Sequence, residues 1–427
     1  MKLFELKTSI QKGELDKRLA YVYGGKAQAL SQRDRYLELL ESFEKLFPGN
    51  RDGVRLFSTP GRTEVAGNHT DHNHGKVLAA SIDLDTIAAV TVRADDIITV
   101  ASVGFPAITI NLNELEAVES EKGDSAALVR GICARFRQLG MNIGGFDAVT
   151  TTKVLKGSGL SSSAAFEVLI ATILNELYNN GKLSAVELAV ISQYAENVYF
   201  GKPCGLMDQT ACAVGGFVYI DFGDPANPII EKLDVDFEQT DHILCIVDTG
   251  GSHSDLTDDY KAIGDEMRAV AKLLGGEVLR DVPSNTFFDA IPKLRAEVGD
   301  RALERAIHFY RENERVEKEV AALTADDFEK FKKYFQLSGY SSFMYNQNVY
   351  TSKSPEEQPV ALALAISDNL LSDKGGVWRV HGGGFAGTVQ SIMPKAQLNR
   401  YMKSMKAVFG EKSCYILSIR TEGTSEI

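Results

Sequence analysis

Apolar residues recur every three or four positions in several long stretches of the chain. Residues 1–50 show this spacing up to a Pro-Gly-Asn turn at 48–50, and 162–180 and 183–200 repeat it. Such spacing places the apolar side chains on one face of a helix, which can then pack against a core. The pattern therefore predicts an N-terminal helical layer, two amphipathic helices in the middle of the chain, and charged helices between 255 and 375.

Strand-like segments lie between these helices. They combine β-branched residues with partial alternation and cover 77–92, 108–111, 146–154, 215–222, 242–249, 385–393 and 413–419. Because strands and helices do not follow a strict βαβ succession, an α+β fold is predicted. The chain of 427 residues is long enough for two cores. We therefore expect a helical extension over 1–50, a first domain over 51–225 and a second over 226–427.

Composition and charge narrow the possible functions. The net charge of −12 argues against a nucleic-acid or membrane-surface binder, because both of those partners are polyanionic. The first residues lack the apolar core of a signal peptide, and no run approaches 18 apolar residues. The five cysteines are odd in number and scattered, which is typical of reduced thiols in a cytoplasmic protein.

A glycine- and serine-rich segment, KGSGLSSSAAF at 156–166, runs from a strand-like stretch into the first mid-chain helix. The first backbone N–H groups of a helix have no partner within the helix, and its dipole adds positive charge, so this junction is a candidate phosphate site. Glycines let the backbone approach phosphate oxygens closely. A simple helix cap explains the serines as well. The segment is not a Walker A loop, because no Gly-Lys-Ser/Thr closes it.

Two further segments carry chemistry. The polar cluster at 61–74, GRTEVAGNHTDHNH, precedes the strand at 77–92, and we expect it to form a sugar-binding loop, with a metal site and a solvated turn as alternatives.

In CGLMDQ at 204–209, Asp208 stands among apolar residues. A desolvated carboxylate beside a cation suits a general base, although a helix cap is the simpler explanation.

Together these motifs resemble those of the galactokinase family, a branch of the GHMP small-molecule kinases. The family's first signature, Gly-Arg-x-x-x-Ile-Gly-Glu-His-Thr-Asp-Tyr-Asn, resembles 61–73. Its Gly-Leu-Ser-Ser-Ser-Ala-Ala matches 159–165, its Cys-Gly-Ile-Met-Asp-Gln resembles 204–209, and HGGGFAGTVQ at 381–390 is similar to its third motif. The resemblance implies an S5-like α/β N-terminal domain, a ferredoxin-like α+β C-terminal domain, and an active site in the cleft between them.

The resemblance also implies roles for individual residues. Asp208 and Arg62 correspond to the catalytic pair, and Gly382 to Gly384 are expected near them. Ser162 and Glu196 correspond to the Mg²⁺ ligands, although Glu196 alone looks like a surface charge. The implied sugar contacts are Asn68, His69, Asp71, Gly205 and Tyr260. The implied ATP contacts are Lys156, Gly157, Ser158, Gly159, Leu160, Ser161, Ser162 and Ser163. The expected protein is a monomeric, ATP-dependent and Mg²⁺-dependent kinase of the galactose C1 hydroxyl.

Three departures from the family pattern keep other functions open. Asn68 stands where the family has a glutamate, and His72 where it has a tyrosine. These changes are compatible with another sugar, such as galacturonate, N-acetylgalactosamine or arabinose. The family's tryptophan near adenine is absent from DSAALVRG at 124–131, which bears on nucleotide selectivity. A non-catalytic sugar sensor is the alternative from another functional class.

Overall fold

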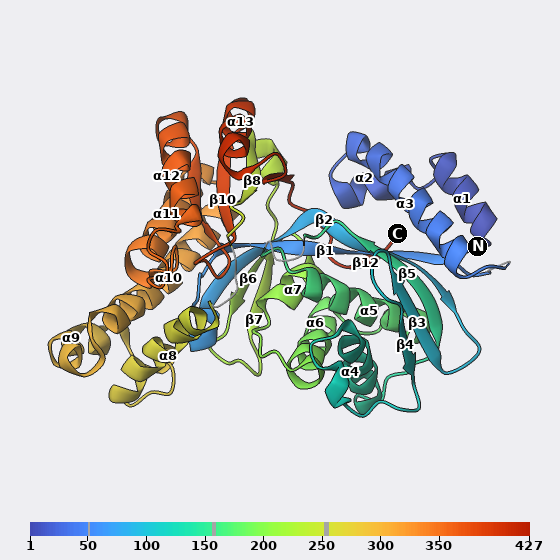
Figure 1. Ribbon diagram of the computed structural model, residues 1–427, viewed down its shortest axis with the longest axis horizontal. Coiled ribbons are helices and arrows are strands. Elements are labelled where there is room, and N and C mark those ends of the chain that lie inside the picture. The colour runs from blue at the N-terminus through green and yellow to red at the C-terminus, as the bar shows by residue number, and fades with distance from the viewer. Residues whose placement is uncertain (50–51, 156–158, 252–255) are drawn as a thin grey trace.

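The computed structural model describes residues 1–427 except 50–51, 156–158 and 252–255. Two β-sheets organise these residues (Figure 1). The larger sheet has the order β12-β1-β2-β5-β3-β4, with β6 paired to β2 and β7 paired to β6. Its strands are β1 (Arg55–Ala66), β2 (Lys76–Val92), β3 (Ile97–Ser102), β4 (Ile108–Asn111), β5 (Phe146–Thr152), β6 (Phe217–Asp221), β7 (Ile229–Leu233) and β12 (Ser425–Glu426).

Helices cover both faces of this larger sheet. One face packs against α1 (Leu3–Gln11), α2 (Asp16–Tyr23) and α3 (Lys26–Leu46). The other packs against α4 (Ser125–Gln138), α5 (Ser162–Tyr178), α6 (Ala185–Tyr194) and α7 (Met207–Val214). The alternation along β2 explains this arrangement, because Ile87 and Ala89 face the first layer while Ala88 and Val90 face the second.

The smaller sheet has the order β11-β8-β10-β9. Its strands are β8 (His242–Asp248), β9 (Val377–His381), β10 (Thr388–Pro394) and β11 (Cys414–Leu417). The helices of this half are α8 (Thr257–Leu273), α9 (Ser284–Val298), α10 (Asp300–Thr324), α11 (Phe328–Ser341), α12 (Pro359–Leu371) and α13 (Leu398–Phe409). The predicted α+β class is confirmed.

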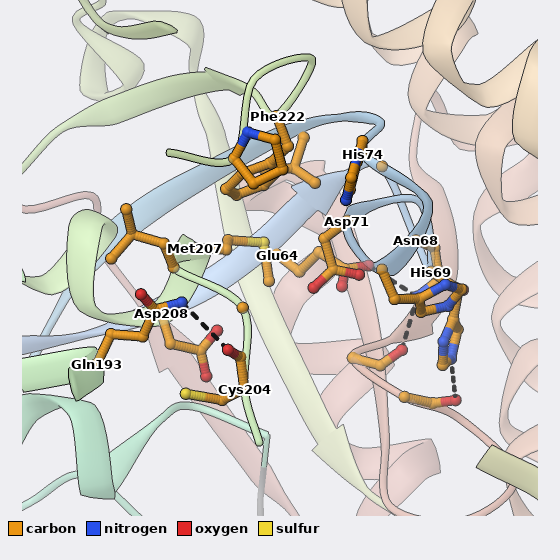
Figure 2. A pocket seen from close by; sticks show the side chains of 18 of the residues that line it. Glu64, Asn68, His69, Asp71, His74, Gln193, Cys204, Met207, Asp208 and Phe222 are labelled. Atoms are coloured by element: carbon orange, nitrogen blue, oxygen red, sulfur yellow. Dashed lines mark hydrogen bonds between the residues drawn. The ribbon is translucent and has the colours of Figure 1, made fainter. Parts of the chain in front are cut away.

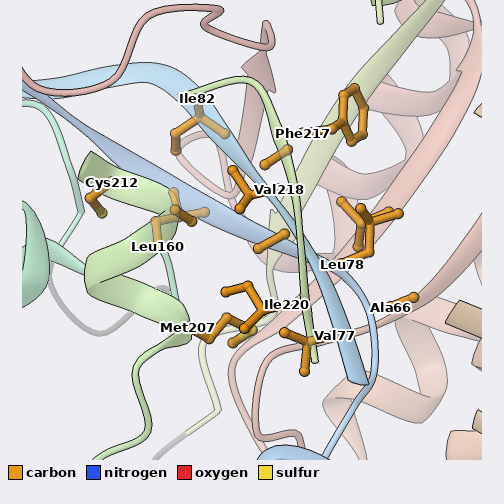
Figure 3. Packing of buried hydrophobic residues seen from close by; sticks show 14 of the residues in the cluster. Ala66, Val77, Leu78, Ile82, Leu160, Met207, Cys212, Phe217, Val218 and Ile220 are labelled. Atoms are coloured by element: carbon orange, nitrogen blue, oxygen red, sulfur yellow. The ribbon is translucent and has the colours of Figure 1, made fainter. Parts of the chain in front are cut away.

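One apolar core joins the two sheets. Leu78 and Phe217 of the larger sheet belong to the same buried cluster as Ile246 and Ile392 of the smaller one. Figure 3 shows part of this cluster between β2, β6 and α7, with Met207 packed against it. Because Met207 immediately precedes Asp208, the core fixes the position of the segment that carries the candidate catalytic carboxylate.

The polar cluster at 61–74 differs from the sequence-based prediction of a loop. Arg62 and Glu64 lie within β1, and only the residues after Ala66 leave the strand and form a short 3-10 turn over Asp71–Asn73. The prediction was wrong because β1 buries polar residues throughout, so it lacks the apolar pattern of an ordinary strand. The helix predicted over 183–200 also divides, into α6 and a π-helical segment over Ala195–Phe200.

The proposed domain boundary at 225/226 stays a prediction. The strands on either side of it, β6 and β7, pair with each other in the larger sheet. The chain first enters the smaller sheet at β8. It returns to the larger one at its end, where β12 pairs with β1.

Candidate active site

A cavity of about 600 Å³ lies where the two sheets meet. Most of its lining comes from β1, the turn after it, residues 203–206 with the start of α7, and Gly382–Gly383 after β9. Val77, Gln193, Phe222 and Pro225 complete the lining. In the view of Figure 2, Asp208 lies on one side of the cavity and His69 on the other, with Glu64 and Asp71 between them. The cavity therefore brings together residues that are more than 300 positions apart in the chain.

Arg62 and Asp208 form an ion pair at the wall of this cavity. The Nε atom of Arg62 donates to Oδ1 of Asp208 at 2.8 Å, and its Nη2 atom lies 2.6 Å from the same oxygen. Ser161 donates its hydroxyl to Oδ2 of Asp208. Arg62 is almost fully buried, whereas about a third of the Asp208 side chain is exposed. The aspartate is thus fixed on its protein side and open towards the cavity.

The glycine-serine segment lies directly against β1. The carbonyl of Gly159 accepts a hydrogen bond from Nη1 of Arg62, and the carbonyl of Leu160 accepts one from the backbone N–H of Arg62 at 3.1 Å. A Cβ atom on Gly61 would lie 2.7 Å from the Leu160 oxygen, so only glycine allows this approach. Ser161 precedes α5 in a left-handed conformation, with φ of 59°, and Ser162 and Ser163 open the helix.

The helix N-terminus therefore points its free N–H groups near the Arg62–Asp208 pair, as an anion site requires. Lys156, Gly157 and Ser158, also predicted as ATP contacts, lie outside the described residues.

Of the five predicted sugar-binding residues, four line the cavity and one, Tyr260, does not. His69 and Asp71 line the cavity, and Nε2 of His69 lies 2.9 Å from the carbonyl oxygen of Gly383. Gly205 faces Asp71, and a Cβ atom on it would lie 2.8 Å from Oδ2 of that aspartate. Asn68 also belongs to the lining but is fully buried. Tyr260, on α8, donates to the Gly384 carbonyl at 2.8 Å and packs behind Gly383 rather than in the cavity lining.

Burial controls the protonation of the histidines in the turn. It lowers the pKa of His72 to about 4, although the negative charge of Asp71 acts in the opposite direction. The same desolvation lowers the pKa of His69. Both imidazoles are therefore neutral near pH 7 and can accept or donate hydrogen bonds to a polyol without adding charge. Within the described ranges, no group of three or more His, Cys, Asp and Glu side chains is arranged to hold a metal ion.

Sequence reasoning missed a second buried carboxylate beside Glu196. Glu196 is only 3% exposed, because the π-helical segment turns it inward, and Glu167 on α5 is fully buried. Gln209 bridges them, with Nε2 at 2.8 Å from Glu196 and 3.1 Å from Glu167. Lys202 contacts Glu196 at 3.2 Å. The signal for Glu167 was a lone acidic residue within the apolar stretch AAFEVLIAT.

The pair fits a hard divalent cation. Burial, reinforced by the charge of Glu196, raises the pKa of Glu167 well above its usual range. A divalent cation beside the two carboxyl groups would favour their ionised forms. Its Oε1 atom has no hydrogen-bond partner within the described part of the chain. A Mg²⁺ ion typically takes one or two protein carboxylates and completes its shell with water and phosphate oxygens. Glu196, with Glu167 beside it, therefore offers the kind of oxygen donors that this ion needs.

The sequence matches two family descriptions. Residues 41–92 match the "Galactokinase galactose-binding signature", and residues 127–216 match the "GHMP kinases N terminal domain". The chain is 32% identical to a galactokinase of Streptomyces coelicolor, in an alignment that covers 86% of this chain and 92% of that protein. It is 29% identical to a galactokinase of Clostridium tetani, over 91% and 97% of the two chains.

Solved structures show the same similarity. The galactokinase of Lactococcus lactis, crystallised with galactose, superposes with a TM-score of 0.76 at 26% identity and covers 91% of this chain and 98% of its own. The mevalonate kinase of Methanococcus jannaschii superposes with a TM-score of 0.61 at 15% identity, over 86% and 99% of the two chains. The second similarity concerns the fold alone.

Proposed function

This chain belongs to the galactokinase family, and we propose that it transfers the γ-phosphoryl group of ATP to the anomeric C1 hydroxyl of galactose. The products are galactose 1-phosphate and ADP. The observation that carries this proposal is the Arg62–Asp208 pair, which opens into the cavity beside the N-terminus of α5. One side of the pair can receive a sugar hydroxyl, and the other adjoins the candidate phosphate site.

Asp208 is the proton acceptor in this proposal. The C1 hydroxyl donates a hydrogen bond to the exposed part of the Asp208 carboxylate and gives up its proton as the oxygen attacks the γ-phosphorus. The bond from that phosphorus to the bridging oxygen of ADP breaks in the same step. Arg62 keeps the carboxylate in place and offers positive charge to the transferring group. Positioning and electrostatic stabilisation then account for most of the rate.

The segment from Gly159 to Ser163 binds the ATP phosphates in this proposal, through backbone N–H groups at the start of α5. Ser162 and Glu196 would hold the Mg²⁺ ion, with Glu167 next to them. When bound, the ion neutralises charge on the ATP phosphates and orients them for transfer. Besides such an ion, the described partners of the buried Glu196 carboxylate are Lys202, which forms an ion pair with it, and Gln209, which donates a hydrogen bond to it.

Replacing Glu196 by glutamine tests the metal assignment. We expect the Mg²⁺ concentration for half-maximal activity to rise about tenfold or more, because an amide oxygen binds a hard cation less strongly than a carboxylate. The measurement is a Mg²⁺ titration of ADP formation at saturating ATP and galactose. Glu231→Gln, the same change at an exposed position on β7, serves as the control. An unchanged titration midpoint in Glu196→Gln would remove Glu196 from the metal site.

The decisive experiment measures ADP release from MgATP with galactose, galacturonate, N-acetylgalactosamine, arabinose and glucose. We expect galactose to be the best substrate. Activity with only another sugar would keep the kinase chemistry and change the substrate. No activity with any sugar, although sugar still binds, would favour a sensor.

A monomer in the cytoplasm is part of the same proposal. The free state of the five cysteines supports the cytoplasmic location. No helix among the described residues is long and apolar enough to cross a membrane. Light scattering coupled to size-exclusion chromatography tests the monomer.

A further inference from the structure

The side-chain amide of Asn68 is fully occupied by the protein. Its Nδ2 atom donates to Oε1 of Glu64 at 2.9 Å and to the carbonyl oxygen of Gly382 at 2.7 Å. Its Oδ1 atom accepts from Asn348 at 2.8 Å and from Ser342 at 3.2 Å. An amide has two donors and room for two strong acceptor contacts, so none remains for a ligand. The partners also fix which end of the amide is nitrogen, because Nδ2 meets only acceptors.

Glu64 has the opposite arrangement. Both hydrogen bonds that the described residues make to its carboxylate end on Oε1, one from Asn68 and one from Arg379 at 3.1 Å. Oε2 receives none of them. It is also not among the described polar atoms that are both inaccessible to solvent and without a hydrogen-bond partner. Glu64 lines the cavity, where Figure 2 shows it between Asp208 and Asn68 in that view. An acceptor oxygen of the Glu64 carboxyl group thus faces the space that a sugar would occupy.

We propose that Glu64, rather than Asn68, supplies the carboxylate that accepts hydrogen bonds from the bound sugar, through Oε2, and so is a specificity-determining residue of this kinase. The inference rests on the proposed function. The family signature that residues 61–73 resemble has a glutamate at position 68, whereas this chain has an asparagine there that donates a hydrogen bond to Glu64. The acceptor charge is thus kept in the cavity but comes from β1 instead of the turn after it.

The position of Glu64 suits this role. It lies two residues after Arg62 on the same strand, and both side chains line the cavity. A spacing of two residues corresponds to about 7 Å along a strand, so the carboxylate lies well beyond the position of the reacting hydroxyl beside Asp208. Asp71 and His69 approach the cavity from the turn. Glu64 would therefore contact a hydroxyl away from C1.

A double-mutant cycle, in which one change is made in the enzyme and the other in the sugar, tests the proposal. The variant Glu64→Gln is compared with the wild type on galactose and on galactoses that each lack one hydroxyl other than C1. For galactose we expect KM to rise about 10- to 100-fold with little change in kcat, because a hydrogen bond to a charged group is lost from ground state and transition state alike. Removing one particular hydroxyl should also raise KM for the wild type. For that deoxygalactose, Glu64→Gln should cause little further rise in KM, because the hydroxyl that Glu64 binds is already absent.

Glu319→Gln is the matched control, because Glu319 is also a fully buried glutamate but lies on α10 outside the cavity lining. Its KM should stay at the wild-type value. The role of Glu64 would be overturned if Glu64→Gln left KM unchanged, or if it raised KM by the same factor for galactose and for every deoxygalactose. Either result would leave the kinase function intact. A wild type without activity on galactose would overturn the proposed function and this inference with it.

The pH dependence gives a second measurement that does not require the glutamine variant to fold. Burial raises the pKa of Glu64 to about 7. The negative charge of Asp71 also raises it, whereas the positive charges of Arg379 and Arg62 lower it. His381, whose Nε2 lies 3.4 Å from the backbone nitrogen of Glu64, is kept neutral by burial. Because the ionised carboxylate is the better acceptor, the KM for galactose should rise as the pH falls through about 7. A KM that stays constant through this range would contradict the proposal.

Discussion

Replacing Asp208 by asparagine is expected to lower the rate of galactose-dependent ADP formation about 10²- to 10⁴-fold, the usual contribution of a positioned general base. The amide cannot take the proton of the C1 hydroxyl, and it can turn an NH₂ group towards Arg62. The change should appear mainly in kcat, because the sugar keeps its contacts with the turn after β1. Steady-state kinetics with MgATP and galactose provide the measurement.

Loss of fold must be separated from loss of chemistry, because the substitution leaves Arg62 without its carboxylate. Thermal unfolding of Asp208→Asn should therefore be recorded together with galactose binding. Asp221→Asn is a suitable control, since Asp221 pairs with Arg280 at 2.9 Å but does not belong to the cavity lining. If Asp208→Asn kept more than about a tenth of the wild-type rate, a different group would have to accept the proton.

Replacing Asp85 by asparagine is expected to destabilise the fold by about 3–5 kcal/mol, the cost of removing one partner from a buried ion pair. Asp85 is fully buried and pairs with Arg35 of α3 and with Arg420, which lies 3.3 Å from Oδ2. Tyr23 donates its hydroxyl to the same carboxylate at 2.5 Å. The variant would leave two buried guanidinium groups without a counter-charge. Urea unfolding of the two proteins gives the difference directly.

The same network predicts the direction of acid sensitivity. Arg35 and Arg420 lower the pKa of Asp85 below its usual value, against the effect of burial. A carboxyl with a lowered pKa stabilises the fold above its unfolded-state pKa, near 4, and this contribution is lost as the pH falls through the folded-state value. Asp85→Asn should therefore reduce the stability that is lost when the pH falls from about 4 to below the folded-state pKa of Asp85. An equal acid sensitivity in both proteins would show that other carboxylates dominate.

Much of the fold follows from local pattern. The helices α5 and α6 and the strands β2, β6 and β8 were predicted because their apolar residues have helical or strand spacing. β1 could not be predicted in this way. Its Arg62 and Glu64 are buried polar residues, and their partners Asp208 and Arg379 lie 146 and 315 positions away. Only the folded chain shows that these charges are paired.

The site was predicted unevenly for the same reason. The pairing of Arg62 with Asp208 was implied by the resemblance to the family motifs, whereas the hydrogen bond from Ser161 to Asp208 was not predicted. The burial of Glu196 depends on a π-helical segment that apolar spacing does not reveal. The contrast between Asn68 and Glu64 could not be read from the sequence at all. It depends on which hydrogen bonds each side chain has already formed, and apart from the bond between Asn68 and Glu64 the partners lie beyond position 340.

The pairing of β12 with β1 has a consequence for synthesis on the ribosome. β1 is made early, but the strand that covers its outer edge, Ser425–Glu426, is made about 360 residues later. Arg420, which completes the charge network around Asp85, arrives equally late. The nascent first half must therefore keep an open sheet edge and an incompletely neutralised buried carboxylate until residues 420–426 have been made. Until then the open edge of β1 can pair with strands of other chains, so the growing chain is a natural client for chaperones that shield unpaired strands.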